Sequence, residues 1–188
     1  MAEQRRFRLP RAYKLALALA VVIGPLYWLM LTEDGQRRMD LFVLNLMGRH
    51  GFNVAFERLD ANVTEADLRA QFPRADLACG AAPSSFGERA CVAKIASYSG
   101  VPARMATAYL QGEQLRALRL DYQPRYHPLL RAELRRQHGE PAEQSTTAQP
   151  VMRWQLPGGT LLLPAENVDT PSDAALIWLS RQVDGSSG

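Results

Sequence analysis

The pattern of hydrophobic and polar residues separates an apolar first segment from a mixed remainder. Residues 15–32 read LALALAVVIGPLYWLMLT and carry no charged side chain, whereas the preceding residues 1–14 are basic. A helix over 15–32 covers roughly 27 Å, close to the ~30 Å hydrocarbon core of a bilayer, and satisfies its own backbone hydrogen bonds there. The pattern predicts a basic tail at 1–14 followed by a transmembrane anchor at 15–32.

A cleaved secretory signal and a buried core helix are the alternatives to this anchor. A signal usually has an apolar core of ~7–15 residues and a small-x-small cleavage site. This run is longer and ends in Tyr27-Trp28, whose rings suit a membrane interface. The basic flank argues against a core helix, because basic residues favour the cytoplasmic side. We therefore expect a single-pass protein of a bacterial inner membrane, with the N-terminus cytoplasmic, the C-terminal domain periplasmic and the lipid bilayer as a partner.

Residues 33–54 are predicted to form a juxtamembrane linker that contains one amphipathic helix over 36–48. Gly35 is expected to break the anchor from this helix, and apolar residues then recur at helical spacing. This apolar stripe consists of Met39, Phe42, Val43, Leu46 and Met47. It can pack on the domain, lie along the membrane surface or meet a partner helix. The stripe is our candidate partner-binding surface, and other envelope membrane proteins are the expected partners.

The pattern over 55–183 predicts one α+β domain with a single antiparallel sheet of five or six strands. Helices are indicated at 64–72, where Thr64 can cap the first turn, and at 127–138, which has a proline at its start and Gly139 after its end. Alternating residues indicate strands at 91–98, 104–110, 115–122, 151–156 and 160–164. The run 174–180 favours a strand over a helix, residues 140–150 form a polar connection, and residues 184–188 form a flexible tail.

The two halves of this domain repeat one pattern. In each half a helix precedes three strand candidates, and Leu68 and Leu134 occupy corresponding helix positions. Neither half can bury much surface alone, so two side by side should share one core. The expected fold is α+β: a transmembrane helix, then two tandem helix-plus-three-strand units, 60–123 and 124–181, that share an antiparallel sheet with the helices on one face.

Particular residues in both units carry a family resemblance. They are Val63-Thr64-Glu65-Ala66-Asp67-Leu68 with Phe72-Pro73, and Leu134 with Gly139-Glu140-Pro141 before Trp154. With these residues, about 60–180 resembles the SmpA/OmlA-type domain of small outer-membrane assembly lipoproteins, and the tandem units of the β-lactamase inhibitor protein. The resemblance implies a binding or scaffolding role. The chain departs from the lipoprotein pattern because no cysteine for lipidation follows its apolar run, so the family's partner is not carried over.

The charge distribution gives no support for nucleic-acid binding. The whole chain has a net charge of +3, but residues 33–188 contain 17 basic and 18 acidic side chains, a net of −1. The basic excess thus belongs to the flank of the anchor and indicates membrane topology. We expect no nucleic-acid partner.

The two cysteines, Cys79 and Cys91, are predicted to form a disulfide because an isolated pair in an oxidising compartment usually does so. The sequence GAAPSSFGERA between them suggests a floppy loop. A disulfide across this loop would stabilise the folded state by on the order of 3 kcal/mol. A redox-active pair is less favoured because active dithiols are usually spaced C-x-x-C. Zinc would need two more ligands, and the histidines show no ligand spacing.

No enzyme motif stands out in the sequence. We find no G-x-S-x-G, H-E-x-x-H, phosphate-binding loop or dinucleotide fingerprint. His127 is interpreted as a helix cap or loop residue, and His138 as a residue of a helix C-terminus. The aromatic residues at strand positions are interpreted as core: Tyr109, Tyr122, Trp154 and Trp178. Six residues are expected to be largely buried: Leu118, Leu120, Leu130, Leu134, Trp154 and Trp178.

We therefore predict no catalytic, cofactor-binding or metal-binding residue and no cofactor. The expected function is that of an inner-membrane-anchored periplasmic binding or assembly module, a non-catalytic subunit of a cell-envelope complex. The alternative is an envelope enzyme, a hydrolase or thiol oxidoreductase, with an unrecognised active site.

Overall fold

The computed structural model describes residues 10–144, 150–166 and 168–181. The chain divides into two compact units, Met1–Phe42 and Val43–Gly188. The predicted basic tail and the polar connection at 140–150 lie partly outside the described residues, and the predicted tail at 184–188 lies wholly outside them.

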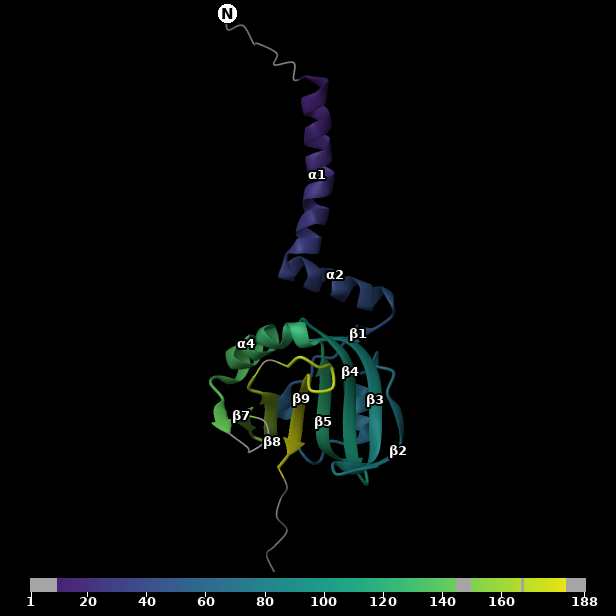
Figure 1. Ribbon diagram of the computed structural model, residues 1–188. Helices are drawn as coiled ribbons and strands as arrows, with labels where there is room; N and C mark the ends of the chain where they lie inside the picture. The colour runs from purple at the N-terminus through teal and green to yellow at the C-terminus, as the bar shows by residue number, and fades with distance from the viewer. Residues whose placement is uncertain (1–9, 145–149, 167, 182–188) are drawn as a thin grey trace, which may run out of the picture. The chain divides into compact units, whose positions relative to one another are not determined.

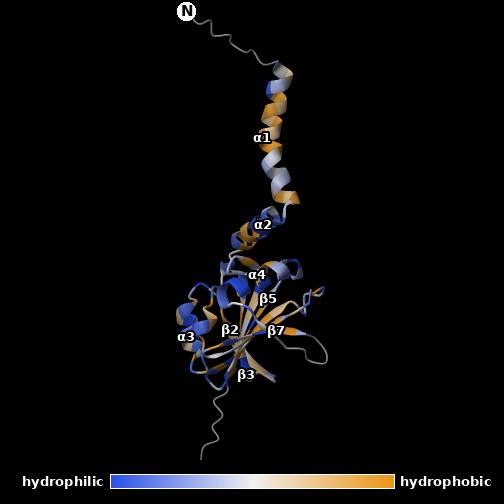
Figure 2. Cartoon of the chain, turned by 90° about the vertical axis from the view of Figure 1, so that its left-hand side faces the viewer, coloured by the Kyte–Doolittle hydropathy of each residue, from blue (hydrophilic) through white to orange (hydrophobic). Residues whose placement is uncertain are grey.

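The first unit contains α1 (Arg11–Leu31) and most of α2 (Glu33–Leu46). By length and composition α1 could cross a membrane, and Figure 2 shows strongly hydrophobic residues along much of it. The break between the helices is at Thr32, which has extended backbone angles, and not at Gly35 as predicted. Gly35 is buried within α2, where a Cβ would lie 2.6 Å from the backbone of Leu29. Its missing side chain lets the two helices approach closely.

One mixed sheet organises the second unit (Figure 1). Its strands are β1 (His50–Gly51), β2 (Ala78–Ser84), β3 (Gly87–Tyr98), β4 (Val101–Gln111), β5 (Gln114–Tyr122), β6 (Ala142–Gln144), β7 (Val151–Leu156), β8 (Gly159–Pro164) and β9 (Ala175–Ser180). Eight of the nine strands follow the order β1-β3-β4-β5-β9-β8-β7-β6, and β2 pairs with β3. The β1–β3 pairing is parallel and the other pairings are antiparallel.

The six predicted strands are all present, including a strand in the run 174–180, but the predicted sheet was too small. Strands β1, β2 and β6 were missed, and the parallel β1 makes the sheet mixed instead of antiparallel. As a result four strands follow each domain helix in sequence, not three. The connection between β4 and β5 is a tight turn, because Gln111 pairs with Gln114 and Gly112 adopts a φ of 62°.

The domain helices α3 (Glu65–Gln71) and α4 (His127–His138) pack on one face of the sheet, with short 3-10 helices η1 (Phe56–Arg58) and η2 (Pro124–Tyr126). Thr64 caps α3 in a reciprocal box with Asp67, as its position predicted. Leu68 of α3 joins the same buried core as α4 and the strands. The six residues expected in that core are each at most 3% exposed: Leu118, Leu120, Leu130, Leu134, Trp154 and Trp178.

Candidate partner-binding surface

The sheet has a second face on which neither α3 nor α4 packs. Its central row follows from the strand register, which pairs Val92 with Thr107, Arg119, Ile177, Leu162 and Arg153 in succession across β3, β4, β5, β9, β8 and β7. Figure 1 shows β3, β4 and β5 side by side with no helix in front of them. Directly paired residues point to the same side of a sheet. Val92, Ile177 and Leu162 therefore share one row with Arg119 and Arg153 on the side of the sheet away from α3 and α4.

Parallel rows extend this surface. Met105 pairs with Lys94, and Tyr109 is linked through Ala117 to Leu179. We define the outer face as Val92, Lys94, Met105, Thr107, Tyr109, Arg119, Arg153, Leu162, Ile177 and Leu179. All except Thr107 are partly or fully exposed, and Phe86 packs beside Tyr109 with ring centroids 5.3 Å apart. Tyr109 was thus wrongly interpreted as core, whereas Tyr122, Trp154 and Trp178 are buried as expected.

Arg119, at the centre of the outer face, is held in place by two contacts. Its Nε donates to Asp121 Oδ1 at 2.7 Å, and its Nη2 donates to the carbonyl of Ser172 at 3.0 Å. Asp121 lies two residues along the same strand, and Ser172 lies in the segment before β9. The guanidinium is therefore partly ordered within the domain itself, and an ordered side chain loses less entropy when it forms a further contact.

The apolar stripe predicted from the sequence lies on α2 and directly after it. Its side chains range from 37% exposed at Met39 to 78% at Leu46. Arg37 and Arg38 bind Asp34 in the first turns of the same helix, and these hydrogen bonds, that of Arg38 first, hold the pKa of Asp34 below its usual range. The helix thus combines a charged first half with exposed apolar residues, and the role of the stripe stays a prediction.

The predicted Cys79–Cys91 disulfide is present, but the floppy loop between the two cysteines is not. Cys79 pairs directly with Cys91 in the β2–β3 hairpin. The prediction of a loop was wrong because Ala, Gly and Pro conceal the strand pattern of β2, while backbone hydrogen bonds to β3 supply its order. The bridge fixes β2 to a strand whose Cys91 is fully buried.

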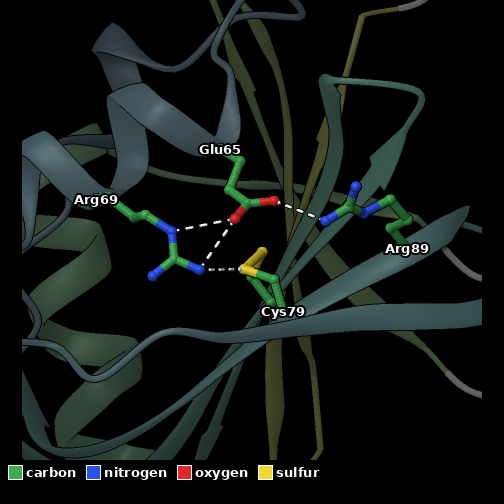
Figure 3. Close-up of a disulfide and its surroundings, with 5 residues drawn as sticks. Glu65, Arg69, Cys79 and Arg89 are labelled. Atoms are coloured by element: carbon green, nitrogen blue, oxygen red, sulfur yellow. Dashed lines mark hydrogen bonds and ion pairs between the residues drawn. A yellow bond between two sulfur atoms is a disulfide. The ribbon is translucent and has the colours of Figure 1, made fainter.

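A polar cluster connects this disulfide to α3 (Figure 3). Glu65 accepts hydrogen bonds from Arg69 at 2.9 and 3.0 Å and from Arg89 at 3.0 Å. Arg69 Nη2 also donates to Cys79 Sγ at 3.2 Å. Glu65, Cys79 and Cys91 lie close enough to suggest metal ligands, but a thiolate is the form that binds metal and both sulfurs are bonded to each other. With the disulfide formed, the cluster links α3 to the β2–β3 hairpin through hydrogen bonds.

His127 is buried, contrary to its interpretation as a cap or loop residue. Its Nδ1 lies 2.6 Å from the hydroxyl of Tyr122, and the side chain is 1% exposed. The turn η2 directly before α4 brings this ring into the core. Burial, and secondarily the charge of Arg131, lowers the pKa of His127, while burial raises the pKa of Tyr122. The pair is a neutral hydrogen bond in the protein interior.

His138 at the end of α4 is also sequestered. Its side chain is 4% exposed, and Nδ1 lies 2.9 Å from Glu57 Oε1 of η1. Substrate contact requires an accessible atom, so neither buried ring is placed for chemistry at the surface.

Comparisons of the chain with protein-family models, with curated proteins and with solved structures found no match. The resemblance to the SmpA/OmlA-type domain therefore stays a prediction. Function has to be argued from the outer face, the α2 stripe and the disulfide cluster.

Proposed function

We propose that this protein is an inner-membrane-anchored periplasmic module that binds another envelope membrane protein and supports assembly of a complex without catalysing a reaction. The observation that carries the proposal is the outer face. A sheet normally buries an apolar face against another layer. Here one face is packed under α3 and α4, and the opposite face keeps partly exposed apolar residues that a partner can cover.

The composition of the outer face supports a protein partner. Interfaces are enriched in arginine, and Arg119 and Arg153 lie in the same row as the apolar Ile177 and Leu162. Arginines between apolar side chains can form directed hydrogen bonds at the rim of a desolvated centre. Because Arg119 is already held by Asp121, its contribution needs little additional ordering.

The strand order supports the proposed tandem units. Strands β2 to β5 follow α3, β6 to β9 follow α4, and the two sets meet where β5 pairs with β9. Each set is thus a helix followed by four strands, with the last strand at the centre of the sheet. We infer that 60–123 and 124–181 are two related units, as the SmpA/OmlA-type resemblance implies.

The anchor and its orientation are supported by α1 and by the basic residues before it. A reporter that is active only outside the cytoplasm, fused after the last residue, should be active. Alkaline carbonate should leave the full-length protein in the membrane fraction. A shortened protein released into the soluble periplasm would show that 15–32 is a cleaved signal.

The α2 stripe is the proposed second contact with the partner. If the stripe contacts the partner, the double substitution Phe42→Asp with Leu46→Asp should abolish co-purification of the partner. A matched control is Gln36→Asp with Asn45→Asp, which adds the same charge at exposed polar positions of α2. If the stripe variant loses thermal stability while binding persists, the stripe is structural and the outer face alone binds.

A thiol oxidoreductase is the second candidate, and the contact between Arg69 and Cys79 favours it. A guanidinium beside a sulfur stabilises the thiolate and accelerates its departure in thiol–disulfide exchange. The candidate predicts that the folded full-length protein oxidises a dithiol peptide, and that Arg69→Gln slows the reaction. Exchange that occurs only when the protein is unfolded would exclude this activity.

A further inference from the structure

A groove at one part of the outer face has an unbalanced positive charge. Arg49, Lys94 and Arg104 line it together with Met105 and Tyr109, and Pro171-Ser172 contribute from the segment before β9. Lys94 and Met105 are cross-strand partners. Cationic and apolar side chains thus line one concave site on strands β3 and β4 and on the chain before β1.

The cations of this groove differ in whether they are already neutralised. Arg119 is paired with Asp121, also in the groove. Arg49, Lys94 and Arg104 make no ion pair with a carboxylate among residues 10–144, 150–166 and 168–181. Three positive charges beside apolar side chains suit a ligand that is anionic at one end and apolar at the other.

The length of chain between the anchor and Arg49 limits how far the groove can lie from the bilayer. One residue separates α1 from α2, and three residues lead from the end of α2 to Arg49. The helix adds about 21 Å and the three residues about 10 Å, so Arg49 lies within roughly 30 Å of the end of the anchor. An α2 helix lying in the membrane interface would bring Arg49 to the lipid headgroups.

We propose that this groove binds the phosphodiester headgroup of an anionic phospholipid in the leaflet next to the domain. Arg49, Lys94 and Arg104 bind phosphate oxygens, and Met105 and Tyr109 contact the glycerol and the first acyl carbons. The proposal rests on the membrane anchoring proposed above. It gives the tethered domain a preferred orientation, with part of the outer face on lipid and the apolar row through Ile177 and Leu162 left for the protein partner.

The test uses the full-length protein in phosphatidylcholine vesicles that contain a small amount of photoactivatable phosphatidylglycerol, with crosslinks mapped by mass spectrometry. Crosslinks on α1 report insertion, and crosslinks on 94–109 report the groove. If α1 is not labelled, the anchoring proposal fails. If α1 is labelled and the groove is not, only the groove proposal fails.

Paired variants separate a site from general attraction. Lys94→Gln with Arg104→Gln should reduce groove labelling about tenfold while α1 labelling is unchanged. The control, Arg58→Gln with Arg74→Gln, removes the same charge from two exposed residues outside the groove and should label like the parent. Equal loss in both pairs would overturn the proposal.

Competition identifies the ligand class. Unlabelled phosphatidylglycerol should displace the probe, and equal concentrations of glycerol phosphate or of a glutamate-rich peptide should not. Displacement by glycerol phosphate would make a free phosphate ester the ligand, and displacement by the peptide would make the groove a protein site. Labelling of the groove by a phosphatidylcholine probe to the same extent would also overturn the proposal.

Discussion

The two faces of the same sheet differ in what covers them, although the same strands supply both. In β5, Leu118 and Leu120 face the helices and are at most 2% exposed, while Arg119 and Asp121 face the other way and retain solvent contact. The side chains on the helix-covered face belong to the same buried core as Leu68 of α3. The difference separates a packed side from an open side of one layer, so substitutions on the two sides should differ in their effects on stability and on the proposed binding.

The largest effect on stability should come from the helix-covered face. Leu134→Ala on α4 removes a fully buried side chain, and loss of transfer energy together with the cavity should cost ~2–5 kcal/mol. Leu162→Ala on the outer face should cost less than ~1 kcal/mol, because the side chain is partly exposed. Urea unfolding of the full-length protein in detergent measures both. Equal costs would mean that the two faces do not differ as described.

Loss of the disulfide should have the next largest effect. Cys79→Ala with Cys91→Ala removes the bond that fixes β2 to β3, and the chain-entropy model gives about 3 kcal/mol for a loop of this size. Reduction of the disulfide in the parent protein should lower its melting temperature by about as much as the two substitutions do. A negligible change in both experiments would show that strand pairing alone holds β2.

Acidification should destabilise the helix-covered face through His127. Its folded pKa is lowered, so the unfolded chain binds a proton first as the pH falls through the ordinary value of ~6.5. The contribution of His127 to the free energy of unfolding is fully present above that pH. It is lost progressively as the pH falls below that value toward the folded pKa. The fall in melting temperature between neutral pH and pH ~5 should be smaller in His127→Gln. Identical pH profiles would contradict a neutral buried His127.

The smallest effect on stability, and the largest on binding, should come from the outer face. Ile177→Ser with Leu162→Ser exchanges partly exposed side chains and should change the free energy of unfolding by less than about 1 kcal/mol. The same variant should lose most of its partner in co-purification. A large stability loss would mean that this face is part of the core.

The sequence predicted the helices, six strands, the six core residues and the disulfide because each had a local signal. Alternation in 115–122 and the proline at the start of α4 are signals of this kind. Strands β1 and β6 are too short to show a period, and β2 contains Gly80 and Pro83. Their order comes from pairing with β3 and β7, which a local pattern does not reveal.

Alternation in β5 puts Arg119 and Asp121 opposite Leu118 and Leu120, but the rest of the outer face could not be found from the sequence. In β3, Val92 on one side is chemically similar to Ala93 and Ile95 on the other, so the pattern of this strand does not say which side is covered. Only the positions of α3 and α4 decide it. The burial of His127 likewise depends on the η2 turn. The hydrogen bond from Arg69 to Cys79 depends on the packing of α3 beside the β2–β3 hairpin.

Site-specific photocrosslinking in living cells tests the central claim, that the outer face binds a membrane protein, most directly. A photoreactive amino acid replaces Ile177 on the outer face or, as the control, Arg58 in η1, which is exposed outside the outer face. The account predicts one crosslinked band in the membrane fraction from position 177 and its absence from position 58. The same band from both positions, or from neither, would contradict it.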